Sequence, residues 1–241
     1  MADYTVQLNG WFETPLGRLL LCKESEMLQQ ILPHLFGYHL LQISNVGHSN
    51  LLNSSLIKHR CILSRAANTI NKPYTSIYGY ADTLPIAHDS VDVVVLPHVL
   101  EFEANPHEIL REIERILIHE GHLVVIGFNP ISLWGLWRVR RTIPWTGKFL
   151  SLLRLKDWLA LLNFDIIEQH TFFFAFPFHN AHLSKYATFI EKISSRWTKN
   201  LGAVYILVAK KRVATLTPIR PTWLTQPTIV TEAIGTSFKQ K

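Results

Sequence analysis

A histidine and a glutamate follow the most apolar stretch of the chain. Residues 91–96 are almost uniformly apolar, and Pro97 ends the run. His98 and Glu101 come directly after it. Because an imidazole titrates near neutral pH, His98 is a candidate general base that would take a proton from a nucleophile. The alternative is that His98 packs and hydrogen-bonds locally, and Glu101 fits a structural role.

The twelve histidines raise the question of a metal site. Two pairs have a spacing of three residues: His119 with His122, and His179 with His182. Neither pair forms the helical His-Glu-x-x-His pattern, and neither has an obvious third ligand. We therefore predict no metal site.

Aromatic and basic side chains are mixed in the segment 129–146. These side chains are Trp134, Trp137, Arg138, Arg140, Arg141 and Trp145. Such a mixture suits a lid that meets an anionic or amphipathic substrate, an anionic membrane surface or, less well, nucleic acid. The alternative is an insertion whose tryptophans pack on the edge of the sheet while its arginines are solvated. We predict that residues 134–145 control substrate access and do not contribute to fold stability.

The strands and helices that must position these residues alternate along the chain. Strands are expected at residues 39–43, 59–63, 74–78, 91–96, 123–126, 164–167 and 204–209, and helices at 14–36, 51–58, 106–120, 151–162 and 183–197. A strand that is apolar at successive positions, as at 91–96, is typical of a parallel sheet covered on both faces. The pattern predicts a doubly wound α/β sheet that binds ligands at the carboxyl ends of its strands.

Four stretches of sequence resemble the class I S-adenosylmethionine-dependent methyltransferases of type 11. They are Ala81–Ile86 (Ala-Asp-Thr-Leu-Pro-Ile), Asp89–Val95, Leu100-Glu101 and Leu110–Leu117 (Leu-Arg-Glu-Ile-Glu-Arg-Ile-Leu). The resemblance covers about residues 40–209 and is most specific over 82–128. It implies a mostly parallel, seven-stranded, Rossmann-like sheet preceded by a helix, S-adenosylmethionine as cofactor, and methyl transfer to a small or amphipathic acceptor.

The same resemblance implies which residues contact the cofactor. They are Gln42, Ser44, Gly47, Asp82, Thr83, Leu84 and Pro97. The family has three glycines in its first loop and an acid before them, whereas residues 42–48 contain only Gly47 and begin with Gln42. Ser64 and Arg65 stand where the family has an acid for the ribose. Because side chains at former glycine positions restrict the backbone, the alternative is a catalytically inactive binding or regulatory module with the same fold.

Three segments are expected: an N-terminal helical extension (1–36), a methyltransferase-like domain (37–212) and a flexible tail (213–241) rich in proline and threonine.

The net charge of +6 permits an anionic partner without selecting one. Cys22 and Cys61 have no metal-ligand spacing, which fits a reducing compartment. With no signal-peptide pattern and no long apolar run, we expect a cytoplasmic protein.

Overall fold

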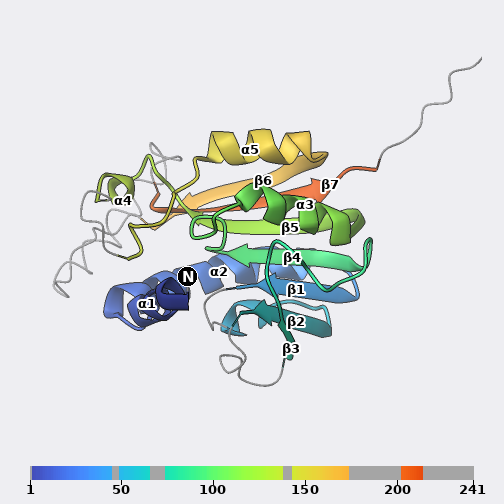
Figure 1. Cartoon of the computed structure of the whole chain (residues 1–241), viewed down its shortest axis with the longest axis horizontal. Helices are drawn as coiled ribbons and strands as arrows, with labels where there is room; N and C mark the ends of the chain where they lie inside the picture. Colours follow the sequence, from blue (N-terminus) through green and yellow to red (C-terminus); the bar gives the residue numbers. More distant parts are fainter. Residues whose placement is uncertain (1, 45–48, 66–73, 138–142, 174–201, 214–241) are drawn as a thin grey trace, which may run out of the picture.

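The computed structural model describes residues 2–44, 49–65, 74–137, 143–173 and 202–213 (Figure 1). The strands are β1 (His39–Ile43), β2 (His59–Ser64), β3 (Thr75–Tyr78), β4 (Val91–Pro97), β5 (Leu117–Phe128), β6 (Phe164–Phe172) and β7 (Val204–Lys211). The helices are α1 (Ala2–Phe12), α2 (Pro15–Ile31), α3 (Pro106–Ile116), α4 (Leu133–Leu136) and α5 (Leu152–Leu161), with short 3-10 helices η1 (Leu32–His34) and η2 (Ser49–Leu52).

The strands form one sheet of seven in the order β3-β2-β1-β4-β5-β7-β6. Neighbouring strands from β3 to β5 are parallel, and β7 is antiparallel to both β5 and β6. The predicted mostly parallel, seven-stranded sheet is therefore confirmed. Since β1 continues to β2 on one side and borders β4 on the other, the order reverses at the β1–β4 boundary. Ligands bind in sheets of this kind at the carboxyl ends of the strands beside such a reversal.

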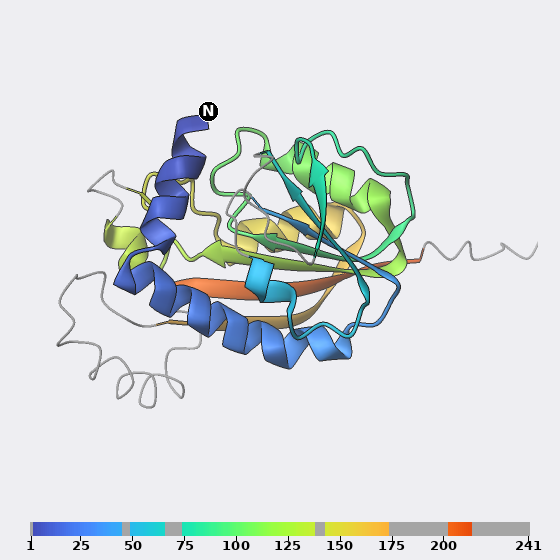
Figure 2. The same ribbon diagram turned by 90° about the horizontal axis from the view of Figure 1, so that it is seen from below.

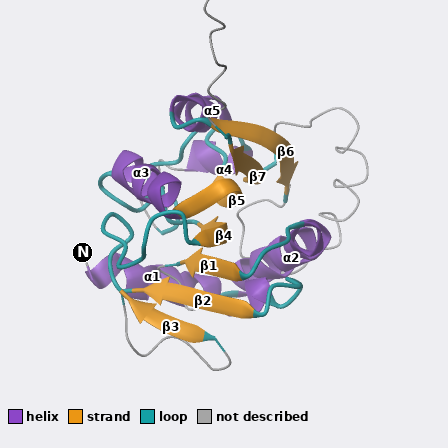
Figure 3. Cartoon of the chain, turned by 90° about the vertical axis from the view of Figure 1, so that its right-hand side faces the viewer, coloured by secondary structure: helices purple, strands orange, loops and turns teal. Residues whose placement is uncertain are grey.

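Helices cover both faces of the sheet. Figure 3 shows α2 on one face and α3 with α5 on the other. Alternate residues of β4 enter the two cores: Val93 and Val95 pack on the α2 side, and Val94 and Leu96 on the α3 side. This two-sided burial explains why the strand is apolar at successive positions.

The N-terminal extension contains two helices joined at a tight corner. The hydroxyl of Thr14 accepts a hydrogen bond from the Gly17 amide (3.2 Å) and so caps α2, and Pro15 begins the helix. A Cβ at Gly17 would lie 2.4 Å from the Trp11 carbonyl oxygen, so only glycine lets the helices approach this closely. The corner places α1 near the carboxyl ends of β4 and β5 (Figures 1 and 2).

Three predicted helices differ from the structure. The predicted helix 14–36 ends as α2 at Ile31 and continues through Pro33 only as the 3-10 helix η1, since proline lacks the N–H that an α-helix requires. The predicted helix 51–58 is the 3-10 turn η2. The predicted helix 106–120 ends at Ile116, because Leu117 is already extended and begins β5. The predicted helix 183–197 and most of the predicted tail lie outside the described residues.

Lys211 fixes the early end of α3. Its ammonium is buried and donates to the carbonyl oxygens of Glu114 (2.7 Å) and Leu117 (2.8 Å). It also pairs with the Asp89 carboxylate at 3.1 Å. The lysine therefore satisfies carbonyl groups that the end of a helix leaves without partners.

Replacing Lys211 should destabilise the fold more than replacing its neighbour. Lys211→Met leaves buried carbonyl groups unsatisfied and should lower the free energy of unfolding by about 1–3 kcal/mol. Lys210→Met, which removes a more exposed partner of Glu120, should change it by less than about 1 kcal/mol. Urea unfolding of both variants would measure the difference, and equal losses would contradict the capping role.

Candidate functional site

The carboxyl edge of the sheet brings together most of the residues predicted to contact the cofactor. Gln42 and Ser44 are buried at the end of β1, and the Ser44 amide donates to the Leu63 carbonyl at 3.1 Å. Pro97 is buried at the end of β4. Asp82 and Thr83 follow β3 and are at least partly exposed. Gly47 lies outside the described residues.

The turn after β3 is held in place by α3. Glu112 accepts a hydrogen bond from the Leu84 amide (3.1 Å), and Arg115 donates to the carbonyl oxygens of Leu84 (3.1 Å) and Ile86 (2.9 Å). Leu84 is buried in the core between the sheet and α3, so its side chain supports the turn. These contacts leave the polar groups of Asp82 and Thr83 at the surface of the edge.

His98 lies in a buried cluster of charged groups. It has a left-handed backbone (φ 50°), and its ring stacks on Phe128 with the centroids 4.1 Å apart. Nε2 is 2.7 Å from Oε1 of Glu24, and Nδ1 is 3.6 Å from Oε1 of Glu101. The side chains of His98, Glu24 and Glu101 are all at most 2% exposed. We call these three residues the His98 cluster.

The His98 cluster keeps the imidazole charged at neutral pH. Burial disfavours the imidazolium, but the carboxylates of Glu24 and Glu101 outweigh it and raise the pKa of His98 to about 9. An imidazolium has no lone pair with which to take a proton, and both ring nitrogens face carboxylates. The predicted role of His98 as a general base therefore does not fit this arrangement, whereas the local packing alternative does.

Glu24 was not predicted as a site residue, although the sequence contains a signal for it. It lies on the buried face of α2, one turn from both Leu20 and Leu28. A charged residue in the apolar stripe of a helix indicates a buried partner. That partner, His98, is 74 residues away in the sequence and could not be identified from the helix alone.

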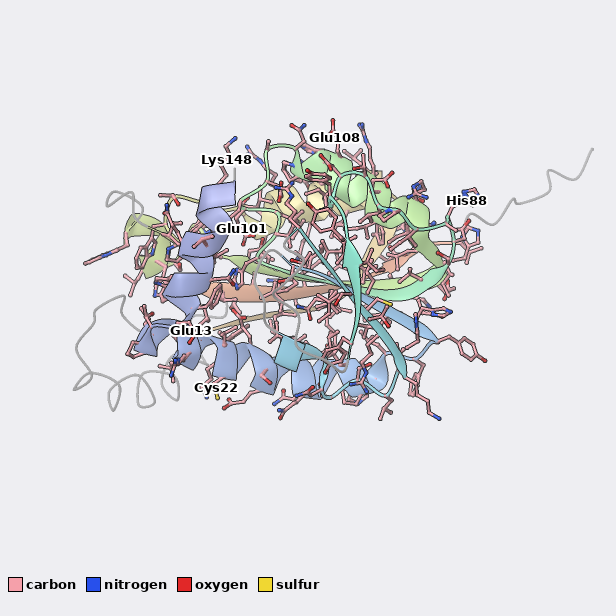
Figure 4. All side chains as sticks on the ribbon, turned by 60° about the horizontal axis from the view of Figure 1, so that its bottom comes forward. Glu13, Cys22, His88, Glu101, Glu108 and Lys148 are labelled. Carbon is pink, nitrogen blue, oxygen red and sulfur yellow. The ribbon has the colours of Figure 1, made fainter. Side chains whose placement is uncertain are left out.

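Glu101 connects the His98 cluster to β5. Its Oε1 accepts a hydrogen bond from the Phe128 amide at 2.7 Å. A Cβ on Gly127 would lie 2.8 Å from this oxygen and 2.5 Å from the Tyr205 hydroxyl, so the strand needs glycine there. Burial, and secondarily the charge of Glu101, raises the pKa of Tyr205 well above its usual range. Figure 4 shows Glu101 beside α1, at the opposite end of the molecule from His88.

Two of the three tryptophans of the 129–146 segment, Trp134 and Trp145, belong to the core. Trp134 is 1% exposed and Trp145 is 8% exposed. Their rings lie 5.9 Å and 6.4 Å from the ring of Trp11 in α1, and Trp134 also stacks on Phe128 at 5.9 Å. The prediction that this segment does not contribute to stability is wrong for these side chains, because they join α1 to the sheet. Arg138, Arg140 and Arg141 lie outside the described residues.

A second ion pair joins the loops after β2 and β4. Nη2 of Arg65 is 2.9 Å from Oε2 of Glu103, whose side chain is 8% exposed. The Arg65 guanidinium also lies 5.1 Å from the ring centroid of Tyr80, just after β3. Glu103 and Tyr80 were not predicted as site residues, because their proximity to Arg65 depends on the strand order.

The described edge can supply polar contacts to a nucleoside-containing cofactor. Asp82, Thr83 and Glu103 offer oxygen atoms, and Nε of Arg65 is a buried donor for which no hydrogen-bond partner occurs among the described residues. An unsatisfied buried donor of this kind fits a site that accepts a polar ligand group. The adenosine side of the cofactor is therefore chemically compatible with the residues present.

The other cluster of chemically active side chains lies at the opposite edge. A cavity of about 240 Å³ at the start of β1 and β2 is lined by apolar residues together with His39, His59 and Cys61. Nδ1 of His39 is 2.8 Å from Nδ1 of His59. The Cys61 sulfur is 3.8 Å from both ring nitrogens of His59, so it faces the ring and not a lone pair. Within the described ranges, no group of three or more His, Cys, Asp or Glu side chains could hold a metal ion. No helix in the same ranges is long and apolar enough to cross a membrane.

Comparisons with known proteins agree with this geometry. A methyltransferase-domain family matches residues 37–125. The uncharacterized protein YafS of Escherichia coli (strain K12) is 32% identical over 211 residues, which cover 86% of this chain and 82% of YafS.

Solved structures share the fold at lower identity. An S-adenosylmethionine-dependent methyltransferase from Thermotoga maritima gives a TM-score of 0.66 at 16% identity and covers 88% of this chain and 97% of its own. One from Archaeoglobus fulgidus gives 0.59 at 17% identity, with 78% and 92% covered. The [4+2]-cyclase SpnF gives 0.56 at 14% identity, with 79% and 80% covered.

The His98 cluster should make stability depend on pH. Because the pKa of His98 rises from 6.5 to about 9 on folding, its contribution is fully present below pH 6.5 and is lost as the pH rises through 9. The expected loss is on the order of 3 kcal/mol. Urea unfolding between pH 6 and 9.5 should show this fall in the wild type and in the surface control His88→Asn. The double variant Glu24→Gln/His98→Asn should not show it, and an unchanged pH dependence there would refute the charged cluster.

Trp134 should be essential to the stability of the edge. Trp134→Ala should lower the free energy of unfolding by about 3–5 kcal/mol, the range for truncating a buried tryptophan. Trp137→Ala, at a half-buried position of the same segment, is the matched control and should have a smaller effect. Similar losses in chemical denaturation would mean that the Trp11 contacts do not distinguish Trp134.

Proposed function

We propose that this chain, which belongs to the class I S-adenosylmethionine-dependent methyltransferase family, methylates a small or amphipathic acceptor at the carboxyl edge of its sheet. The observation that carries the proposal is the strand order β3-β2-β1-β4-β5-β7-β6 with an antiparallel β7, which creates a ligand-binding reversal between β1 and β4. The methyltransferase-domain family that matches residues 37–125 supports this interpretation for the part of the sheet that contains the reversal.

The chain's own residues would bind and orient the reactants. S-adenosylmethionine, when bound, supplies an electrophilic methyl group on a sulfonium. Gln42 and Ser44 are proposed to contact the cofactor at the end of β1, and Asp82 and Thr83 to contact its adenine side after β3. Pro97 is proposed to contact the cofactor at the end of β4. Positioning of this kind accelerates a displacement by holding the two reacting atoms in line.

The His98 cluster contributes to the site through position and charge. The two carboxylates and the imidazolium have a net charge of −1; His98 and Glu101 follow β4, and Glu24 faces His98 from α2. A fixed negative charge near the edge favours a cationic ligand over a neutral one. His98 itself is proposed as a positioning residue, because it holds α2 and the loop after β4 together.

A non-catalytic binding module is the second candidate. The observation in its favour is the first loop, in which residues 42–48 contain one glycine where the family has three. SpnF has a similar fold but is named as a [4+2]-cyclase, so the fold alone does not determine the reaction. The two candidates differ in whether S-adenosylmethionine binds and loses its methyl group.

Calorimetry and a thermal shift with S-adenosylhomocysteine would test cofactor binding. A ligand that binds only the folded state stabilises it by about 2.7 kcal/mol at a hundredfold excess over Kd, so a clear rise in Tm is expected at millimolar concentration. Incubation with S-adenosylmethionine labelled in the methyl group and a bacterial small-molecule and lipid extract should then label an acceptor. Absence of both binding and labelling would favour the non-catalytic module.

A further inference from the structure

The ion pair between Arg65 and Glu103 connects the two loops that flank the reversal in the sheet. Arg65 follows β2 and Glu103 lies in the loop after β4, while β1 runs between these two strands. The two side chains meet at 2.9 Å across this boundary. A ligand at the carboxyl end of β1 would therefore lie next to both charged groups.

Arg65 has an unused donor at this position. Its Nη2 pairs with Glu103 and its guanidinium lies over Tyr80, but its Nε is buried, and no hydrogen-bond partner occurs among the described residues. Buried donors are almost always satisfied by protein, water or ligand. The arrangement thus offers one free donor beside one carboxylate, which matches a group that both accepts and donates hydrogen bonds.

The other carboxylates of the described edge have other roles, and Asp82, which follows β3, is proposed to contact the adenine side of the cofactor. β1 ends in Gln42 and Ser44, and β2 ends in Ser64, so neither strand supplies an acid. Glu24 and Glu101 face His98 in the buried cluster. In dinucleotide-binding sheets a carboxylate after the second strand binds a ribose hydroxyl.

We infer that Glu103 and Arg65 together recognise the ribose hydroxyls of S-adenosylmethionine, with the carboxylate supplied by the loop after β4 and not by β2. Glu103 accepts a hydrogen bond from one hydroxyl, and Nε of Arg65 donates to a hydroxyl oxygen. Arg65 also orients Glu103 through their ion pair. This inference rests on the proposed function, because it requires that the cofactor binds at this edge.

Titration calorimetry with two ligands isolates the hydroxyl contacts. S-adenosylhomocysteine and its 2′,3′-dideoxy analogue would be titrated into the wild type, Glu103→Gln, and the control Glu108→Gln on the exposed part of α3 (Figure 4). Glu103→Gln should weaken S-adenosylhomocysteine roughly tenfold or more while leaving the analogue unchanged, as for loss of a hydrogen bond to a charged group. Glu108→Gln should behave as the wild type.

Arg65→Lys provides a second variant that keeps the positive charge. Lysine cannot reproduce the fork of the guanidinium, so this variant should also lose discrimination between the two ligands. Equal effects of Glu103→Gln on both ligands, or no effect, would overturn the ribose assignment while leaving cofactor binding intact. Tighter binding of both ligands would overturn it as well and would make the pair a barrier across the crevice. Wild-type protein that binds neither ligand would instead overturn the proposed function itself.

Discussion

The buried contact between Glu24 and His98 determines how the carboxyl edge is built. Two charges removed from water are tolerated only when each meets an opposite charge, so this contact restrains the position of α2 against the loop after β4. Once α2 is fixed, the corner at Gly17 directs α1 along the edge, and Trp11 reaches Trp134 and Trp145. The position of the aromatic cluster at this edge therefore depends on the same contact.

The strands could be located from the sequence because most of them contain a short apolar run, although two are longer than predicted: β5 begins at Leu117 and not at residue 123, and β6 continues to Phe172 and not only to residue 167. The boundaries of α5 could also be predicted, whereas the end of α3 could not, because it depends on a residue far away in the chain. The end of α3 is fixed by Lys211, 94 residues beyond the Leu117 carbonyl that it contacts. α1 was missed because its described buried residues, such as Leu8 and Phe12, are few and lie in its second half.

For the site, the sequence motifs indicated the correct edge of the sheet but not the interactions between its side chains. The turn at Asp82 and the position of His98 after β4 follow from local sequence, and both lie at the carboxyl ends of their strands. The charge of His98 does not follow from local sequence, because it comes from Glu24 on a separate helix. Arg65 and Glu103 likewise meet only because β1 separates β2 from β4 in the sheet. A spacing rule cannot detect such pairs without the strand order.

The antiparallel direction of β7 makes the two ends of the domain unequal for protein engineering. β7 ends at Lys211, which pairs with Asp89 just ahead of β4, so the strand finishes at the amino ends of the parallel strands. α1, in contrast, lies along the edge proposed to bind ligands (Figure 1). A fluorescent reporter or a surface tether attached after β7 would stand away from that edge, whereas the same group attached ahead of α1 would crowd it.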